Sequence, residues 1–235
     1  MRIAAVSSSC PHFGARDALK GIIYARPVKT DPAQRGIIDE ALDELEDVEF
    51  NKTDVMYMRS LGITPAFNDG EEIVDFLEEN EIPIQYGRFS DKDVHACLAR
   101  GEEEGTRTVL INERYKNASS KPEILATAEA IAHEAGHAKD NDTSNSIQEE
   151  LDNLALNVLV HRGFENKYPG IYQGQNSFLF REGVNLYPKL FFEFGADKTG
   201  LKDRVSEKYG HMKAGDDKHP ASKMANEIKQ LDLIA

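Results

Sequence analysis

The stretch that decides the fold is His133-Glu134-Ala135-Gly136-His137, near the C-terminal end of a run from Lys121 to Asp140. If that run is helical, the two histidines lie one turn apart, about 40° from each other around the axis. Two imidazoles on one face can bind the same cation, as tetrahedral zinc requires. Glu134 then lies where its carboxylate can accept a proton from a metal-bound water. The motif predicts His133 and His137 as zinc ligands and Glu134 as the general base.

The run around the motif has the features of a buried helix. Ser119 or Ser120 can cap its start, and Pro122 suits its first turn. Its interior consists mostly of small residues and good helix formers, with apolar side chains on several sides. Burying two histidines and a glutamate without partners would be costly, so we expect them to share one.

Composition indicates a soluble globular protein. The chain has 235 residues, of which 40% are hydrophobic and 29% charged, enough for one domain, or for a core domain with an extension. The net charge of −13 argues against nucleic acid or an anionic membrane as the main partner. Cys10 and Cys97 do not make a disulfide framework, and no signal peptide or membrane span is recognisable. We therefore expect a cytoplasmic protein.

Apolar patterns on both sides of the motif predict an α+β fold. The elements expected before the motif are a short strand at 21–25, helices at about 31–45, 52–61 and 71–80, and strands at 81–89 and 106–115. Those expected after it are helices at about 147–162 (ending at Gly163), 187–194 and 202–209, and a last helix that begins at His219-Pro220. We interpret residues 1–70 as a mixed or helical extension of unknown role and residues 71–235 as the domain that carries the motif.

A third metal ligand must come from outside the motif, because catalytic zinc sites usually have three protein ligands. Glu149 and Glu150, at the start of the helix expected at 147–162, are the candidates. Helical phase favours Glu150, which flanks the apolar stripe of that helix. Glu149 has Asn153 one turn away on the same face, where an amide can orient a ligand histidine. We favour Glu149 and keep Glu150 as the alternative.

Residues 71–162 resemble the zincin metallopeptidases, and within them the ImmA/IrrE type, whose third ligand is a glutamate. Those proteins follow the HExxH helix with Glu-x-x-Ala-Asn, which here is Glu149-Glu150-Leu151-Asp152-Asn153, with Asp152 in place of alanine. The resemblance implies a zincin-like fold, with a small sheet on the active-site helix and a mostly helical C-terminal part. It also implies Zn²⁺ bound by His133, His137 and Glu149, and the strand at 106–115 as the sheet edge that pairs with an extended peptide.

Two further similarities are partial. The motif with its following Ala138 is similar to the metal motif of the FtsH proteases, whose third ligand is a distant aspartate; Asp203 would be its analogue. No membrane span or nucleotide-binding loop accompanies it, so this similarity ranks below the first. His219-Pro220 before a final helix is similar to the HtpX-like zincins.

The expected function is hydrolysis of peptide bonds in a polypeptide substrate. The alternative is a zincin-fold protein that binds a protein partner or regulates it, with a metal site and little turnover. A third possibility, a structural metal site, requires a fourth protein ligand. The side chains that could stabilise an oxyanion are Tyr168, Tyr172, His161, His211 and His219, and for each a structural role is favoured.

Overall fold

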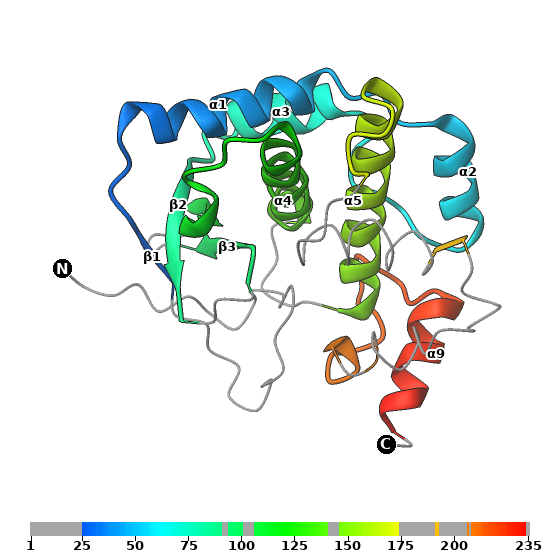
Figure 1. The fold of residues 1–235 in the computed structure, drawn as a ribbon. Coiled ribbons are helices and arrows are strands. Elements are labelled where there is room, and N and C mark those ends of the chain that lie inside the picture. The colour runs from blue at the N-terminus through cyan, green and yellow to red at the C-terminus, as the bar shows by residue number, and fades with distance from the viewer. Residues whose placement is uncertain are drawn as a thin grey trace.

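The computed structural model describes residues 25–90, 94–100, 106–140, 146–173, 191–192, 206 and 208–233. These residues form a four-stranded mixed sheet, with helices packed against it (Figure 1). The strands are β1 (Ala25–Pro27), β2 (Ile84–Phe89), β3 (Ala96–Arg100) and β4 (Arg107–Asn112), in the spatial order β1-β2-β4-β3. β2 and β4 are parallel, and the other two pairings are antiparallel. The prediction of an α+β fold is confirmed.

The prediction that the strand at 106–115 forms the sheet edge is wrong. β4 is an interior strand, because β2 pairs with one of its sides and β3 with the other. The sequence interpretation missed β3, which is only five residues long and lies in a polar segment. Among the described residues, the edge on this side of the sheet is therefore β3.

Three helices lie between β1 and β2 in the chain: α1 (Pro32–Glu46), α2 (Lys52–Ser60) and α3 (Gly70–Glu79). Each begins at an N-cap side chain that accepts backbone hydrogen bonds from the first turn. These caps are Asp31, Asn51 and Asp69. The helices confirm the expected elements to within one or two residues at each end.

The central helix of the molecule is α4 (Lys121–Asp140), whose bounds agree with the sequence prediction. It contacts β3 and β4 as well as α1, α3 and α5 (Figure 1). One apolar core includes residues on both sides of residue 70, from Leu45 and Met58 to Leu125 and Ile131. The boundary that we placed after residue 70 therefore does not separate two cores.

The helix after the motif, α5 (Ile147–Lys167), continues past the expected end at Gly163. Gly163 lies inside this helix. A Cβ at this position would come within 2.4 Å of Val48 Cγ1. The glycine therefore permits close packing against the end of α1, instead of ending the helix.

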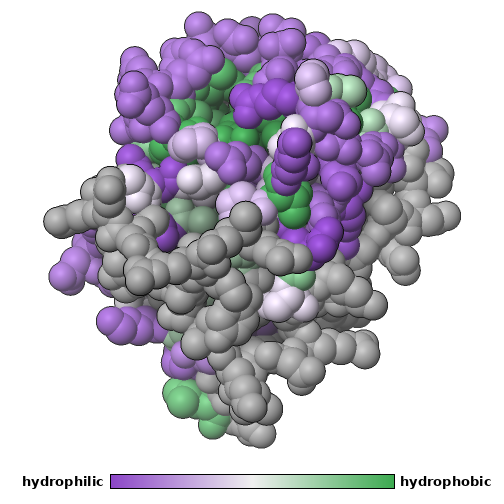
Figure 2. Space-filling model, turned by 90° about the vertical axis from the view of Figure 1, so that its left-hand side faces the viewer, coloured by the Kyte–Doolittle hydropathy of each residue, from purple (hydrophilic) through white to green (hydrophobic). Residues whose placement is uncertain are grey.

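The C-terminal helix α9 (Lys223–Asp232) begins after its N-cap Ser222, so His219-Pro220 belongs to the preceding loop. The helices expected at 187–194 and 202–209 and the strand at 21–25 lie largely outside the described residues. Among the coloured residues of Figure 2, most of the surface is polar, and apolar side chains show between the polar ones. Within the described residues, no helix combines the length and apolar character needed to cross a bilayer.

Candidate metal centre

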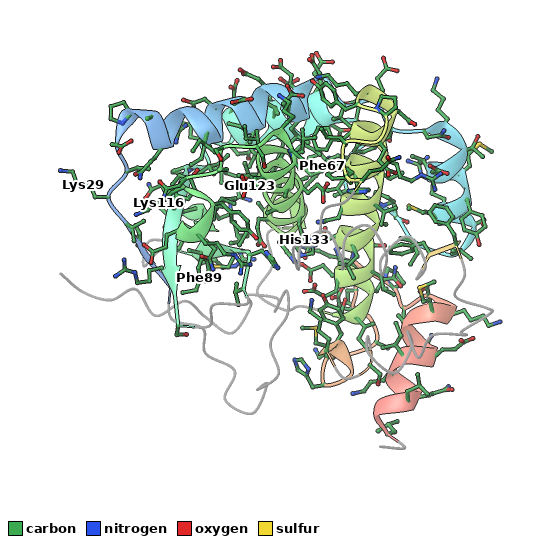
Figure 3. The ribbon with its side chains drawn as sticks, in the orientation of Figure 1. Lys29, Phe67, Phe89, Lys116, Glu123 and His133 are labelled. Carbon is green, nitrogen blue, oxygen red and sulfur yellow. The ribbon has the colours of Figure 1, made fainter. Side chains whose placement is uncertain are left out.

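The candidate site lies between α4 and α5, which pack side by side (Figure 1). His133 is fully buried and lies near the middle of the molecule in Figure 3. The helices approach closely at Gly136, where a Cβ would lie 2.0 Å from Asn153 Oδ1. The glycine of the motif thus lets the two histidines and the start of α5 face each other.

The side chains of His133, His137 and Glu150 meet in one buried cluster, with their ligand atoms within 4.8 Å of one another. The two histidine Nε2 atoms are 3.3 Å apart. Glu150 Oε1 lies 3.6 Å from His137 Nε2, and Glu150 Oε2 lies 3.9 Å from His133 Nε2. Ligand atoms about 2.0–2.1 Å from a tetrahedral zinc lie roughly 3.4 Å from one another. The cluster could therefore hold a metal ion, and its spacing and N/O donors are compatible with those that zinc accepts.

The outer nitrogens of both histidines have buried oxygen partners. His133 Nδ1 lies 3.0 Å from Asn157 Oδ1, and His137 Nδ1 lies 2.6 Å from Glu149 Oε1. Because these oxygens accept hydrogen bonds, they favour the Nδ1–H tautomer, which leaves the Nε2 lone pairs directed at each other. Burial, with the charge of His137 in addition, holds the pKa of His133 well below its usual value. A neutral imidazole with its Nε2 lone pair inward is the form that binds a metal.

The structure groups Glu150, the alternative, with the two histidines, and not Glu149, which we favoured as the third ligand. Glu149 contacts the outer nitrogen of His137, whereas Glu150 faces both Nε2 atoms. Asn153, expected to orient a ligand histidine with its side chain, instead packs against Gly136. The side chains that orient the histidines are Glu149 and Asn157, and sequence reasoning did not select Asn157. Its spacing from Glu150, seven residues or about two turns, is the signal that could have placed it on the same face.

Glu134 lies on the motif helix with only 1% of its surface exposed. Burial raises the pKa of Glu134 to about 8; the charge of Glu149 acts in the same direction, and a hydrogen bond from the backbone of Leu98 opposes it. The contact joins the carboxylate to β3, the edge strand. Glu134 is thus a buried carboxyl with a raised pKa, next to His133 in the sequence, and perturbed pKa values of this kind cluster at functional sites.

The outer edge of β3 carries backbone groups that do not face β4. Asn112 N–H donates to His95 O, so this pair is a hydrogen-bonded one. In an antiparallel ladder such pairs alternate with pairs whose N–H and C=O groups point away from the partner strand. Ala96, Leu98 and Arg100 therefore direct their backbone groups to the outer edge, in agreement with the contact between Leu98 and Glu134.

The side chains considered as oxyanion stabilisers have other contacts. Tyr168 donates to Glu44, while Tyr172 and His161 both contact Glu129, one turn before His133. The rings of His161 and Tyr172 stack with their centroids 4.1 Å apart. His211 is exposed, and Asp203 lies outside the described residues.

His219 lies between Asp140, the last residue of α4, and Asp152, near the start of α5. The hydrogen bond to Asp152 raises the pKa of His219 to about 9, against the effect of partial burial, and the charges of Asp140 and Glu149 add to the shift. Lys218 also lies here, 3.3 Å from Asp140 Oδ1. Since an unfolded histidine has a pKa near 6.5, the stabilisation is complete below about pH 6.5 and disappears as pH rises through about 9.

We therefore expect the Tm of the metal-free protein to fall between about pH 7 and 9.5, as the His219 contribution is lost. His219→Gln removes this titration and should show a smaller fall over the same range. Thermal unfolding followed by circular dichroism with excess chelator measures both. Parallel curves for the two proteins would contradict the assignment of the charge to His219.

Gly136→Ala is expected to lower the free energy of unfolding by about 1–3 kcal/mol, because the added methyl overlaps Asn153 in a packed interface. Gly36→Ala in α1 is the control: nothing lies within 4 Å of its Cβ, so it should be neutral or stabilising. Asn153→Ala should recover part of the loss in the double variant. Urea unfolding measures the stability of all these variants. Equal stability of Gly136→Ala and Gly36→Ala would refute the close approach of α4 and α5 at Gly136.

Comparison with known proteins does not identify a relative: no family model, no curated protein and no solved structure matches this chain. The function has to be inferred from the site itself.

Proposed function

We propose that this chain is a zinc-dependent metallopeptidase of the zincin type, acting on a polypeptide substrate. The observation that carries the proposal is the buried cluster of His133, His137 and Glu150, together with the buried Glu134, which follows His133 on the same helix. A structural zinc is usually closed by four protein ligands, whereas a catalytic zinc keeps a position open. The described part of the chain brings three such side chains together, which supports a catalytic site.

Each residue around the cluster would have its own role in hydrolysis. When bound, zinc supplies a Lewis acid that polarises the scissile carbonyl and lowers the pKa of a coordinated water to about 7. Glu134 would accept a proton from the attacking water and pass it to the leaving amine. The backbone contact with Leu98 holds the carboxylate in place. Asn157 and Glu149 keep both histidine rings oriented with Nε2 toward the cluster.

A polypeptide substrate is supported by the outer edge of β3. The backbone groups of Ala96 and Arg100 and the carbonyl of Leu98 point away from β4, where an extended peptide could add to the sheet. Ala96 and Leu98 are only 2% exposed, so such a peptide requires a movement of the chain around this edge. Because Leu98 contacts Glu134, such a peptide would lie beside the proposed base. The edge strand thus takes the role that the resemblance implied for the strand at 106–115.

A second candidate is a partner-binding protein that holds a metal with little turnover. The burial of the site favours it, because His133, Glu134 and Glu150 are each at most 1% exposed. A substrate could reach these side chains only after a movement of the surrounding chain. The two candidates share the metal and differ in access to it.

The experiment that separates them is cleavage of an unfolded polypeptide, such as labelled casein, with the purified protein. We expect cleavage with zinc, loss of cleavage with a chelator, and recovery when zinc is added back. His137→Ala is the control and should neither bind zinc nor cleave. Zinc binding without cleavage would favour the partner-binding protein, and failure to take up zinc would overturn both candidates.

A further inference from the structure

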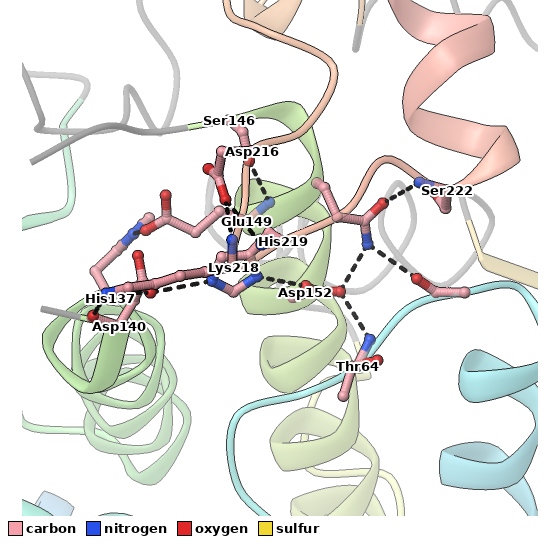
Figure 4. A network of polar contacts seen from close by, with 12 residues as sticks. Thr64, His137, Asp140, Ser146, Glu149, Asp152, Asp216, Lys218, His219 and Ser222 are labelled. Atoms are coloured by element: carbon pink, nitrogen blue, oxygen red, sulfur yellow. Dashed lines mark hydrogen bonds and ion pairs between the residues drawn. The ribbon is translucent and has the colours of Figure 1, made fainter. Parts of the chain in front are cut away.

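The segment Gly210–Ser222 folds against the N-terminal end of α5 (Figure 4). Ile147 N–H donates to Lys213 O at 2.8 Å, and Gln148 N–H donates to Ala214 O at 3.1 Å. The first N–H groups of a helix have no acceptor within the helix, and this segment supplies carbonyl acceptors for two of them. It thereby fixes itself to the helix that carries Glu150.

His219, within this segment, links the ends of the two ligand-bearing helices. Its Nδ1 lies 2.9 Å from Asp152 Oδ2, and its Nε2 lies 3.4 Å from Asp140 Oδ1. Asp140 is the last residue of α4, three after His137. Asp152 is two residues after Glu150 on α5. One imidazole therefore joins the helix of the histidine ligands to the helix of the glutamate.

Asp152 and the loop that carries His219 are held by further hydrogen bonds. Asp152 Oδ1 accepts from Thr64 N–H at 2.7 Å and from Gln148 Nε2 at 2.9 Å. The Gln148 side chain also accepts from Ser222 N–H at 2.8 Å. On the other side, Asp216 Oδ1 accepts from the backbone N–H groups of Lys218 and His219, which fixes the loop that presents the imidazole. Asp152 and the His219 backbone are therefore held by contacts with other protein groups, which belong to the polar network drawn in Figure 4.

We propose that His219 is a positioning residue of the metal centre, which sets the distance between Glu150 and the two histidines by joining Asp140 to Asp152. The inference rests on the zinc site of the proposed function. A zinc ion tolerates little variation in ligand spacing, so loosening one helix against the other weakens binding. The C-terminal segment is then part of the metal centre, although it supplies none of the three clustered ligands.

The test is the zinc affinity of His219→Ala, measured by competition with a chromophoric chelator. We expect the Kd to rise about 10-fold, the low end of the effect of losing a group that orients a ligand directly, because His219 acts through Asp140 and Asp152. His211→Ala, in the same segment and exposed, is the control and should bind like the parent. His219→Gln, which keeps one hydrogen bond, should fall between them. If His219→Ala does not fold, Asp140→Asn replaces it, since it weakens the same link and keeps the side-chain shape.

A second readout separates positioning from general stability. Co²⁺ bound to the parent and to His219→Ala should give different visible absorption, because the ligand field changes with ligand spacing. A merely structural role would lower the Tm of the metal-free protein and leave the Kd and the Co²⁺ spectrum unchanged, which would overturn the inference. Peptidase activity does not enter these readouts. A parent that binds zinc without cleaving overturns the proposed function alone, and one that takes up no zinc overturns both.

Discussion

Glu134→Gln is expected to bind zinc like the parent protein and to cleave polypeptide about 10²- to 10⁴-fold more slowly, the usual contribution of a general base. Glutamine keeps the shape of the side chain and an oxygen that can still accept from Leu98. It cannot take a proton from water. The three clustered ligands are unchanged, so the zinc content should be unchanged as well. Measuring kcat/KM together with the zinc content of the purified variant checks both parts.

The matched control is Glu129→Gln, the same substitution at a buried glutamate five residues earlier on α4. Glu129 contacts His161 and Tyr172, so we expect this variant to lose stability while it keeps zinc and most of its activity. Parental activity in Glu134→Gln would remove this residue from the mechanism. Loss of zinc from that variant would instead mean that Glu134 contributes to metal binding.

The elements that could be predicted from the sequence are those whose cause is local. The bounds of α4 follow from its helix formers and motif spacing, and the structure confirms these bounds. The expected serine cap is not seen: Ser120 Oγ donates to Glu123 Oε2. β3 was missed because a five-residue strand in a polar segment is defined by its pairing with β4, which no local pattern shows. Gly163 was taken for a helix end because its contact with Val48 joins residues more than a hundred positions apart.

The same division applies to the candidate site. The motif itself brought His133, Glu134 and His137 together, because spacing on one helix is a local property. The rotation of α5 about its axis decides which glutamate faces the histidines, and that depends on packing against α4. Helical phase pointed to Glu150, and the expected role of Asn153 pointed away from it. The link from His219 to Asp152 spans 67 positions and has no local signal.

Glu150→Gln is expected to weaken zinc binding far more than Glu149→Gln. The substitution at Glu150 removes a proposed metal ligand, whereas the substitution at Glu149 removes only the hydrogen-bond partner of the ligand His137. Loss of an orienting partner usually costs about 10–100-fold in affinity. Loss of a charged ligand should exceed that range, since two imidazoles remain and the site loses its negative charge. Competition titration with a chelator of known affinity measures both variants on one scale.

The pair is closely matched, because the two glutamates are adjacent on α5, are exposed by only 3% and 0%, and receive the same substitution. General effects of neutralising a buried carboxylate therefore cancel in the comparison. The order of the two affinities then reports which oxygen is directed at the histidine Nε2 atoms. The reverse order, with Glu149→Gln the weaker binder, would make Glu149 the ligand and require α5 to rotate when the ion binds. Glu150 would then move away from the positions 3.6 Å and 3.9 Å from the two nitrogens.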